Sequence, residues 1–262
     1  MIHRAVRAKA PTSFGARARD YDRLRPGYPA RALTEAWAAL GGGPPGTALD
    51  VGCGTGKLAG ALAALGHRVT GVEPDPRMAA VAAAHGLAVE VGAFEAWDPR
   101  GRRFDLVACG QAWHWLRAGD RTAKAARCLR PAGRILLAWN FGSYPPSAEA
   151  GLTRVYAAAL PDGLPAGQGG RKDLTEADAD AYADELRAHG FAATKIAVSW
   201  QSRLASREFC ALLGTESRHL ALPWATRRRL LRAVAAYLDA EEGGEIRTDY
   251  TCVIVAASKA TA

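Results

Sequence analysis

A run of alternate glycines carries the clearest chemical signal in this sequence. Gly52, Gly54 and Gly56 follow Asp50 closely, within the stretch Leu-Asp-Val-Gly-Cys-Gly-Thr-Gly-Lys-Leu. Glycines at such spacing let the backbone turn sharply and let a ligand approach where side chains would collide. The spacing excludes two other glycine-rich loops, the dinucleotide-binding loop and the phosphate-binding loop of nucleotide hydrolases. Lys57 stands where a dinucleotide loop has its third glycine, and a leucine follows Lys57 where a phosphate loop has serine or threonine.

Two carboxylates stand at the ends of the strands predicted on either side of this loop. Asp50 lies at the end of strand 47–51, and Glu73 directly follows strand 68–72. S-adenosylmethionine carries no phosphate, but it has an ammonium group and a ribose diol. Asp50 can accept from the ammonium group, and Glu73 can accept from both ribose hydroxyls, as the acidic residue ~20 positions after a dinucleotide loop does. The pattern therefore indicates S-adenosylmethionine as the cofactor; the alternative for Glu73 is a simple helix cap before Pro74.

Residues 50–56 match in full the acidic-x-Gly-x-Gly-x-Gly loop of the class I S-adenosylmethionine-dependent methyltransferases, and the chain resembles that family over nearly its whole length. Further matching segments are residues 14–29, 71–74, 104–107, 111–115 and 129–134. Together they resemble the small-molecule branch that includes trans-aconitate methyltransferases. The resemblance implies methyl transfer to a small molecule, with S-adenosylhomocysteine as the product.

The same resemblance implies roles for individual residues around the cofactor. Tyr21 and Arg25 would close over the methionyl end, with the Arg25 guanidinium as the partner of the cofactor carboxylate. Ala93 stands where many relatives have Asp or Ser, so the adenine would be held by the Phe94 backbone amide and by apolar packing. The remaining cofactor contacts would come from Gly52, Cys53, Gly54, Pro74 and Gln111.

The segment after the fourth predicted strand, residues 109–115, is expected to face the acceptor. Methyl transfer requires alignment, exclusion of water and, for some acceptors, removal of a proton. His114 is the candidate general base or orienting donor; the alternative is an imidazole that only caps a helix or orients a neighbour. The five cysteines are scattered rather than grouped at metal-ligand spacing, so no metal site is expected and reduced thiols in a cytoplasmic protein fit the pattern.

Alternating strand and helix signals predict an α/β fold. Strands are expected at 47–51, 68–72, 87–91, 104–109, 134–139, 194–201 and 250–256, and helices at 57–65, 76–85, 121–129, 176–189, 206–213 and 225–240. Such alternation implies a parallel sheet with helices on both faces and ligands at the carboxyl ends of the strands. With the family resemblance, we expect a Rossmann-like, seven-stranded, mostly parallel sheet with an antiparallel last strand and a helical lid.

The chain is expected to form a single domain of 262 residues. Residues 1–40 would supply N-terminal lid helices, residues 45–140 the cofactor-binding core, and residues 141–262 the acceptor-side insertion and the C-terminal half of the sheet. Prolines and glycines break the pattern between residues 142 and 171, which we interpret as an insertion over the active site.

The net charge of +8 is concentrated at the start of the chain. Residues 1–31 carry eight basic and two acidic side chains, a net of +6, which leaves +2 for the remainder. We interpret this as a basic arm rather than a nucleic-acid surface, and expect a monomer or homodimer acting on a small-molecule substrate. No apolar run approaches the ~20 residues that span a bilayer, so no membrane association is expected.

Three alternatives share the same cofactor loop. An RNA methyltransferase is disfavoured, because residues 110–113 read Gly-Gln-Ala-Trp where enzymes that methylate exocyclic base amines have Asp/Asn-Pro-Pro-aromatic. A non-methylating cyclase that binds S-adenosylmethionine remains open on the sequence. A non-catalytic sensor of the cofactor is disfavoured by the acceptor segment and the long lid.

Overall fold

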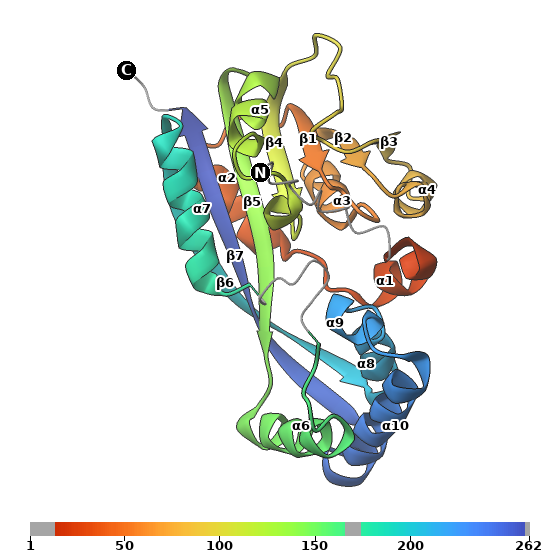
Figure 1. The fold of residues 1–262 in the computed structure, drawn as a ribbon. Helices are drawn as coiled ribbons and strands as arrows, with labels where there is room; N and C mark the ends of the chain where they lie inside the picture. The colour runs from red at the N-terminus through yellow and green to blue at the C-terminus, as the bar shows by residue number, and fades with distance from the viewer. Residues whose placement is uncertain (1–13, 166–173, 260–262) are drawn as a thin grey trace, which may run out of the picture.

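The computed structural model describes residues 14–165 and 174–259, which form a seven-stranded sheet in the order β3-β2-β1-β4-β5-β7-β6 (Figure 1). The strands are β1 (Thr47–Val51), β2 (Arg68–Glu73), β3 (Ala88–Val91), β4 (Phe104–Gly110), β5 (Leu129–Ser143), β6 (Phe191–Ala205) and β7 (Glu245–Lys259). Strand β7 runs antiparallel to both of its neighbours, and the pairs from β3 to β5 are parallel. The predicted fold class, with its antiparallel last strand, is confirmed.

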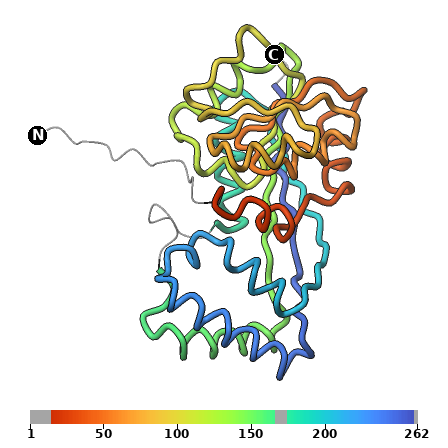
Figure 2. Tube along the Cα trace, turned by 90° about the vertical axis from the view of Figure 1, so that its right-hand side faces the viewer, coloured from red at the N-terminus to blue at the C-terminus, as the bar shows by residue number. Residues whose placement is uncertain are grey.

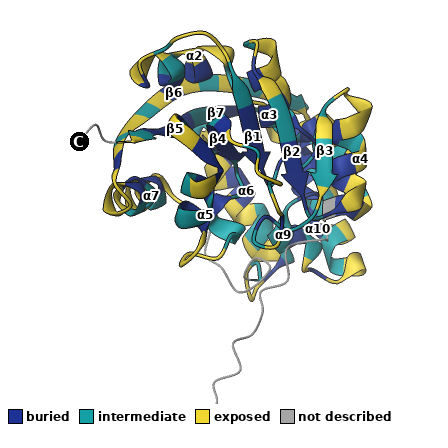
Figure 3. Cartoon of the chain, turned by 90° about the horizontal axis from the view of Figure 1, so that it is seen from above, coloured by how far each residue is buried: buried dark blue, intermediate teal, exposed yellow. Residues whose placement is uncertain are grey.

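Helices cover both faces of the sheet. They are α1 (Ala18–Leu24), α2 (Ala30–Ala39), α3 (Lys57–Ala64), α4 (Pro76–Ala84), α5 (Arg121–Cys128), α6 (Pro146–Ala159), α7 (Glu176–Ala188), α8 (Ser206–Leu213), α9 (Ser217–Leu220) and α10 (Trp224–Glu241), with 3₁₀ turns η1 (Phe14–Arg17) and η2 (Trp113–Trp115). Helices α2 and α3 pack with one apolar cluster on the sheet, and α7 packs with another. Strands β1 and β4 are buried between these layers (Figure 3). Among the described helices, none combines the length and the apolar character needed to cross a bilayer.

Local sequence signals explain where several helices begin and end. Asp75 caps α4 by accepting from the Arg77 N–H (2.9 Å), and Pro76 occupies the first helical position. Gly66 and Gly86 follow α3 and α4 with φ of +94° and +81°, conformations that favour glycine. These residues fix where each helix begins and ends, and the strands that precede the helices therefore end at the same edge of the sheet.

Three strands are much longer than predicted and carry a helical cap. Strands β5, β6 and β7 have 15 residues each. Ala138 is the last residue of β5 that pairs with β4, opposite Gly110. Beyond it, β5 continues to pair with β7 as far as Ser143, opposite Asp249. Helices α6, α8 and α10 gather at this extension around a third apolar cluster that includes Phe209 and Leu230 (Figures 1 and 2).

Two parts of the chain differ from the sequence-based expectation. Residues 146–159, expected to be irregular, form helix α6, because Pro146 lies in its first turn where proline is tolerated. Residues 166–173 of the predicted insertion lie outside the described residues. Helix α2, expected as part of the lid, packs instead against β6 and β7 through Ala32, Leu33 and Ala36, because these small and apolar side chains form one buried face.

Candidate active site

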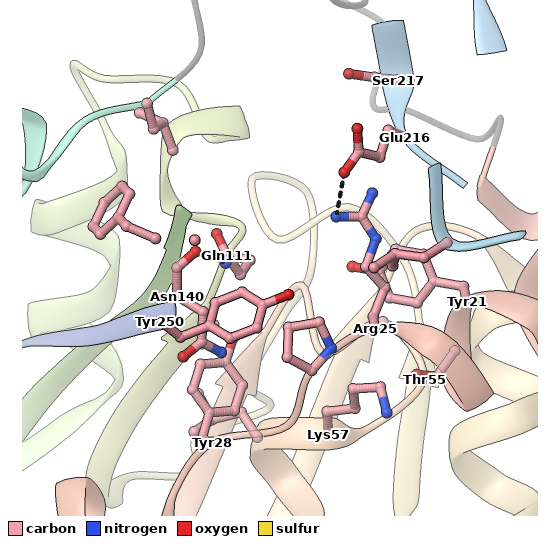
Figure 4. Close-up of a pocket in the computed structure, with 18 of the residues that line it drawn as sticks. Tyr21, Arg25, Tyr28, Thr55, Lys57, Gln111, Asn140, Glu216, Ser217 and Tyr250 are labelled. Carbon is pink, nitrogen blue, oxygen red and sulfur yellow. Dashed lines mark hydrogen bonds and ion pairs between the residues drawn. The ribbon is translucent and has the colours of Figure 1, made fainter. Parts of the chain in front are cut away.

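A cavity of about 460 Å³ opens where β1 and β4 end, between the parallel half of the sheet and the helical cap. Side chains from α1, the glycine loop, η2, β5, β7 and the α8–α9 turn line it. Figure 4 shows Tyr21, Arg25 and Glu216 on one side of this cavity and Gln111, Asn140 and Tyr250 on the other. The volume lies within the range of small-molecule sites.

The glycine loop forms one wall of the cavity in a conformation that requires glycine. Gly52, Gly54 and Gly56 have φ of +66°, +57° and +89°. A Cβ at Gly52 would lie 2.8 Å from the Ala112 Cβ, and one at Gly56 would collide with Leu87. The loop therefore exposes backbone rather than side chains to a ligand.

Asp50 is the most unusual group at the cavity. Its side chain is fully buried, and within the described part of the chain neither carboxylate oxygen accepts a hydrogen bond. Burial raises the pKa of Asp50 to about 8; the Ala59 backbone amide opposes this rise without reaching hydrogen-bond geometry, and the Glu73 charge adds to it. A buried acceptor without a partner is costly, so it marks a position where a donor ligand is expected.

Glu73 braces the glycine loop. Its two carboxylate oxygens each accept one backbone N–H, from Gly54 and from Asp75, both at 2.9 Å. Burial raises the pKa of Glu73, and these two hydrogen bonds oppose the rise. Each oxygen keeps a second lone pair, so the carboxylate can still accept from a ligand.

The structure brings eight of the twelve predicted site residues together on the cavity wall. These are Tyr21, Arg25, Asp50, Gly52, Cys53, Gly54, Gln111 and His114. Glu73, Pro74, Ala93 and Phe94 do not line it. The Phe94 ring belongs to the apolar core, with the Lys124 Nζ 5.2 Å from its centroid, so the ring itself is not available to a ligand.

Arg25 lies at the junction between α1 and the helical cap. Its Nε donates to Thr215 Oγ1 (3.1 Å), and its guanidinium forms an ion pair with Glu216 (3.8 Å), drawn as a dashed line in Figure 4. The guanidinium carbon also lies 5.4 Å from the centre of the Tyr21 ring. Arg25 thus links the first helix to the α8–α9 turn across the cavity mouth.

Gln111 and His114 follow β4 at the acceptor side. Gln111 has φ of +55°, a conformation that few non-glycine residues adopt, and its Nε2 donates to the Asn140 carbonyl (3.1 Å). His114 lies in η2, its ring 4.9 Å from the Trp115 ring. Strained backbone of this kind is often found at functional sites.

Several cavity residues were not predicted from the sequence. Tyr28 is partly buried and packs against Gly110, where an added Cβ would collide with the Tyr28 hydroxyl. Loss of solvation raises the pKa of Tyr28 strongly. Asn140 accepts from Trp200 Nε1 (3.1 Å); it directly follows predicted strand 134–139, so the rule that ligands bind at strand ends could have identified it. Tyr250 comes from the antiparallel β7, which no local pattern connects to the site.

Comparisons with known proteins agree with the fold and the loop. Residues 48–133 match the family model described as a methyltransferase domain. An uncharacterised methyltransferase of Mycobacterium tuberculosis is 38% identical over 133 residues, 49% of this chain and 52% of that protein. A ubiquinone biosynthesis O-methyltransferase of a Methylobacterium species is 37% identical over 101 residues, 35% of this chain and 40% of that protein. The chain thus spans about half the length of the curated relatives it matches.

Solved structures support the same fold at low sequence identity. A candidate type II methyltransferase of Anaeromyxobacter dehalogenans aligns with a TM-score of 0.64 and 22% identity over 88% of this chain and 97% of that chain. A Haemonchus contortus phosphoethanolamine N-methyltransferase, solved with S-adenosylhomocysteine, aligns with a TM-score of 0.52 and 16% identity over 94% and 58%. The chain therefore has the Rossmann-like fold of the class I methyltransferases, and residues 48–133 of it are similar to a methyltransferase domain. Its relation to the trans-aconitate branch stays a sequence-based prediction.

Proposed function

We propose that this chain is an S-adenosylmethionine-dependent methyltransferase that acts on a small-molecule acceptor. The observation that carries the proposal is Asp50, a fully buried carboxylate without a hydrogen-bond donor from the described residues, beside a glycine loop at the cavity. An ammonium group would supply both the charge and the hydrogen bonds that Asp50 lacks. The match of residues 48–133 to the methyltransferase domain supports this assignment.

The residues present fit the cofactor. Asp50 would accept from its amino group, and Glu73 would use its two remaining lone pairs for the ribose hydroxyls. Tyr21 and Arg25 would cover the methionyl end, and the Phe94 backbone amide would contact the adenine. When bound, the cofactor supplies a methyl group already activated by a sulfonium centre.

The acceptor would occupy the part of the cavity lined by Gln111, His114, Asn140 and Tyr250. His114 would accept a proton from a hydroxyl or amine acceptor, or orient an acceptor that is already ionised. The aromatic ring of Tyr250 stacks on Trp200, with centroids 4.6 Å apart, and would help to exclude water from this part of the cavity. Alignment and desolvation are the main contributions that a methyltransferase needs from its protein.

Calorimetric titration with S-adenosylmethionine tests the assignment. The wild-type chain should bind the cofactor, and Asp50→Asn should bind it about 10–100-fold more weakly, because a hydrogen bond to a charged group contributes about 1.5–3 kcal/mol. Asp162→Asn changes an exposed carboxylate that does not line the cavity and should leave the affinity unchanged. A wild-type chain that does not bind, or a folded Asp50→Asn variant with unchanged affinity, would overturn the assignment.

A further inference from the structure

A second groove, of about 330 Å³, lies on the outside of the cap between η1, α8 and α10. Four arginines line it: Arg17 from η1 and Arg227, Arg228 and Arg232 from α10. Within residues 14–165 and 174–259 none of the four pairs with a carboxylate. Burial and the nearby Arg17 charge both lower the pKa of Arg227, so the cluster carries repulsion that no described carboxylate neutralises.

The floor of this groove is apolar. Trp224 is 63% exposed, one of two large hydrophobic side chains that stand out on the described surface. Leu231 and Ala235 continue the floor along α10, at the i+7 and i+11 positions from Trp224, and Cys210 completes it from α8. This spacing puts the tryptophan, leucine and alanine on one face of the helix. The Arg228 guanidinium carbon lies 5.0 Å from the centre of the Trp224 ring.

One acidic residue, Asp239, acts on the pKa of Cys210, and it lies at one end of the groove. Burial first, and the Asp239 charge second, raise the pKa of Cys210 to about 11. Asp239 follows Ala235 on α10, so it acts at the C-terminal end of the groove, away from Arg227 and Arg228. The positive charge is therefore concentrated over the first half of α10.

We propose that this groove docks an acidic amphipathic helix of a partner protein. The apolar side chains of such a helix would pack on Trp224 and Leu231, and its carboxylates would pair with the arginines on either side. Tryptophan and arginine are the residue types most often found at the energetic centre of protein interfaces. From Trp224 to Ala235 the groove runs along about three helical turns, or about 16 Å of α10.

The apolar floor favours a protein partner over a nucleic acid. Single-stranded nucleic acids bind through a basic track combined with several stacking aromatic rings. Here a single exposed tryptophan is followed by Leu231 and Ala235, which fit aliphatic side chains instead. Helix α8 separates the groove from the active-site cavity, since Cys210 lines the groove and Leu212 the cavity, so the inference does not depend on the proposed function.

Fluorescence anisotropy tests this with a labelled synthetic peptide of about three to four turns, with leucines on one face and glutamates beside them. A peptide of the same composition in scrambled order is the first control, and labelled oligouridylate tests the nucleic-acid alternative. We expect the double variant Arg228→Glu/Arg232→Glu, and separately Trp224→Ala, to weaken peptide binding about tenfold or more. Arg68→Glu/Arg127→Glu makes the same charge change at exposed positions away from the groove and should change binding less than about twofold.

Each other outcome overturns the proposal. If the wild-type chain does not bind the amphipathic peptide, or binds the scrambled peptide equally well, the groove is not a site for an amphipathic helix. Equal losses in the groove variant and the Arg68→Glu/Arg127→Glu control would mean general charge attraction. Tighter binding of oligouridylate that is lost in the same groove variants would assign the surface to nucleic acid instead.

Discussion

Protons released when the cofactor binds provide a sharp test of Asp50. The pKa of this carboxyl is about 8 in the free protein, against an ordinary value of 3.8. About 90% of the Asp50 side chains are therefore protonated at pH 7. An ammonium group beside Asp50 favours the ionised form, so binding should lower its pKa and release the proton.

The size of the effect follows from that pKa. Asp50 should contribute about one proton at pH 6, about 0.9 at pH 7 and about 0.5 at pH 8. The ionised fraction rises from about 1% at pH 6 to about 9% at pH 7, so the contribution of Asp50 should strengthen binding about tenfold over this interval, or about 1.4 kcal/mol. The affinity should therefore rise with pH, because the cofactor binds the ionised form of Asp50, and that form accumulates as pH rises.

Calorimetry in two buffers with different ionisation enthalpies measures the number of protons released. Asp50→Asn has no proton to lose at this position, and at pH 6 the cofactor amino group is already protonated, so the difference between wild type and variant at this pH reports the proton of Asp50. Equal proton release by the two proteins, or proton uptake in the difference, would refute the assignment of Asp50 to the amino group.

Three other variants test the site and the packing around it. Glu73→Ala removes the brace on the Gly54 amide and should weaken S-adenosylmethionine binding about tenfold or more; unchanged calorimetric affinity would contradict this. His114→Ala should lower turnover by about 10²–10⁴ with little change in cofactor affinity if the acceptor must lose a proton, and the wild-type rate should then fall at acid pH, because an imidazolium cannot accept a proton. Full activity of that variant at every pH would remove His114 from the mechanism, and a loss without a change of pH profile would indicate positioning. Arg121, only 7% exposed, donates to Glu185 Oε1 (2.9 Å) between α5 and α7. Arg121→Ala removes this ion pair and leaves Glu185 with the Thr122 hydroxyl as its donor. The variant should lower the free energy of unfolding by about 3 kcal/mol, and a loss below about 1 kcal/mol in urea denaturation would count against this.

The sequence by itself determined the parallel half of the sheet and the glycine loop. Both depend on local signals: apolar runs of strand length, glycines with positive φ, and caps such as Asp75. Parallel pairing then brings the ends of neighbouring strands to one edge, with Asp50 opposite Gly71 on β2. Asp50 and Glu73, which are 23 positions apart in the sequence, therefore both lie beside the glycine loop, where Glu73 accepts from the Gly54 amide. This is why the sequence alone could predict that Asp50 and Glu73 bind one ligand.

Only the tertiary structure decided the cap and the acceptor side of the cavity. Strands β5, β6 and β7 continue for 15 residues because β7 pairs with a neighbour on each side, and backbone hydrogen bonds of that kind leave no mark in side-chain periodicity. Arg25 and Thr215 meet across 190 positions of sequence, and Tyr250 reaches the cavity from a strand near the end of the chain. Contacts at such separations depend on how whole elements pack, which no short stretch of sequence encodes.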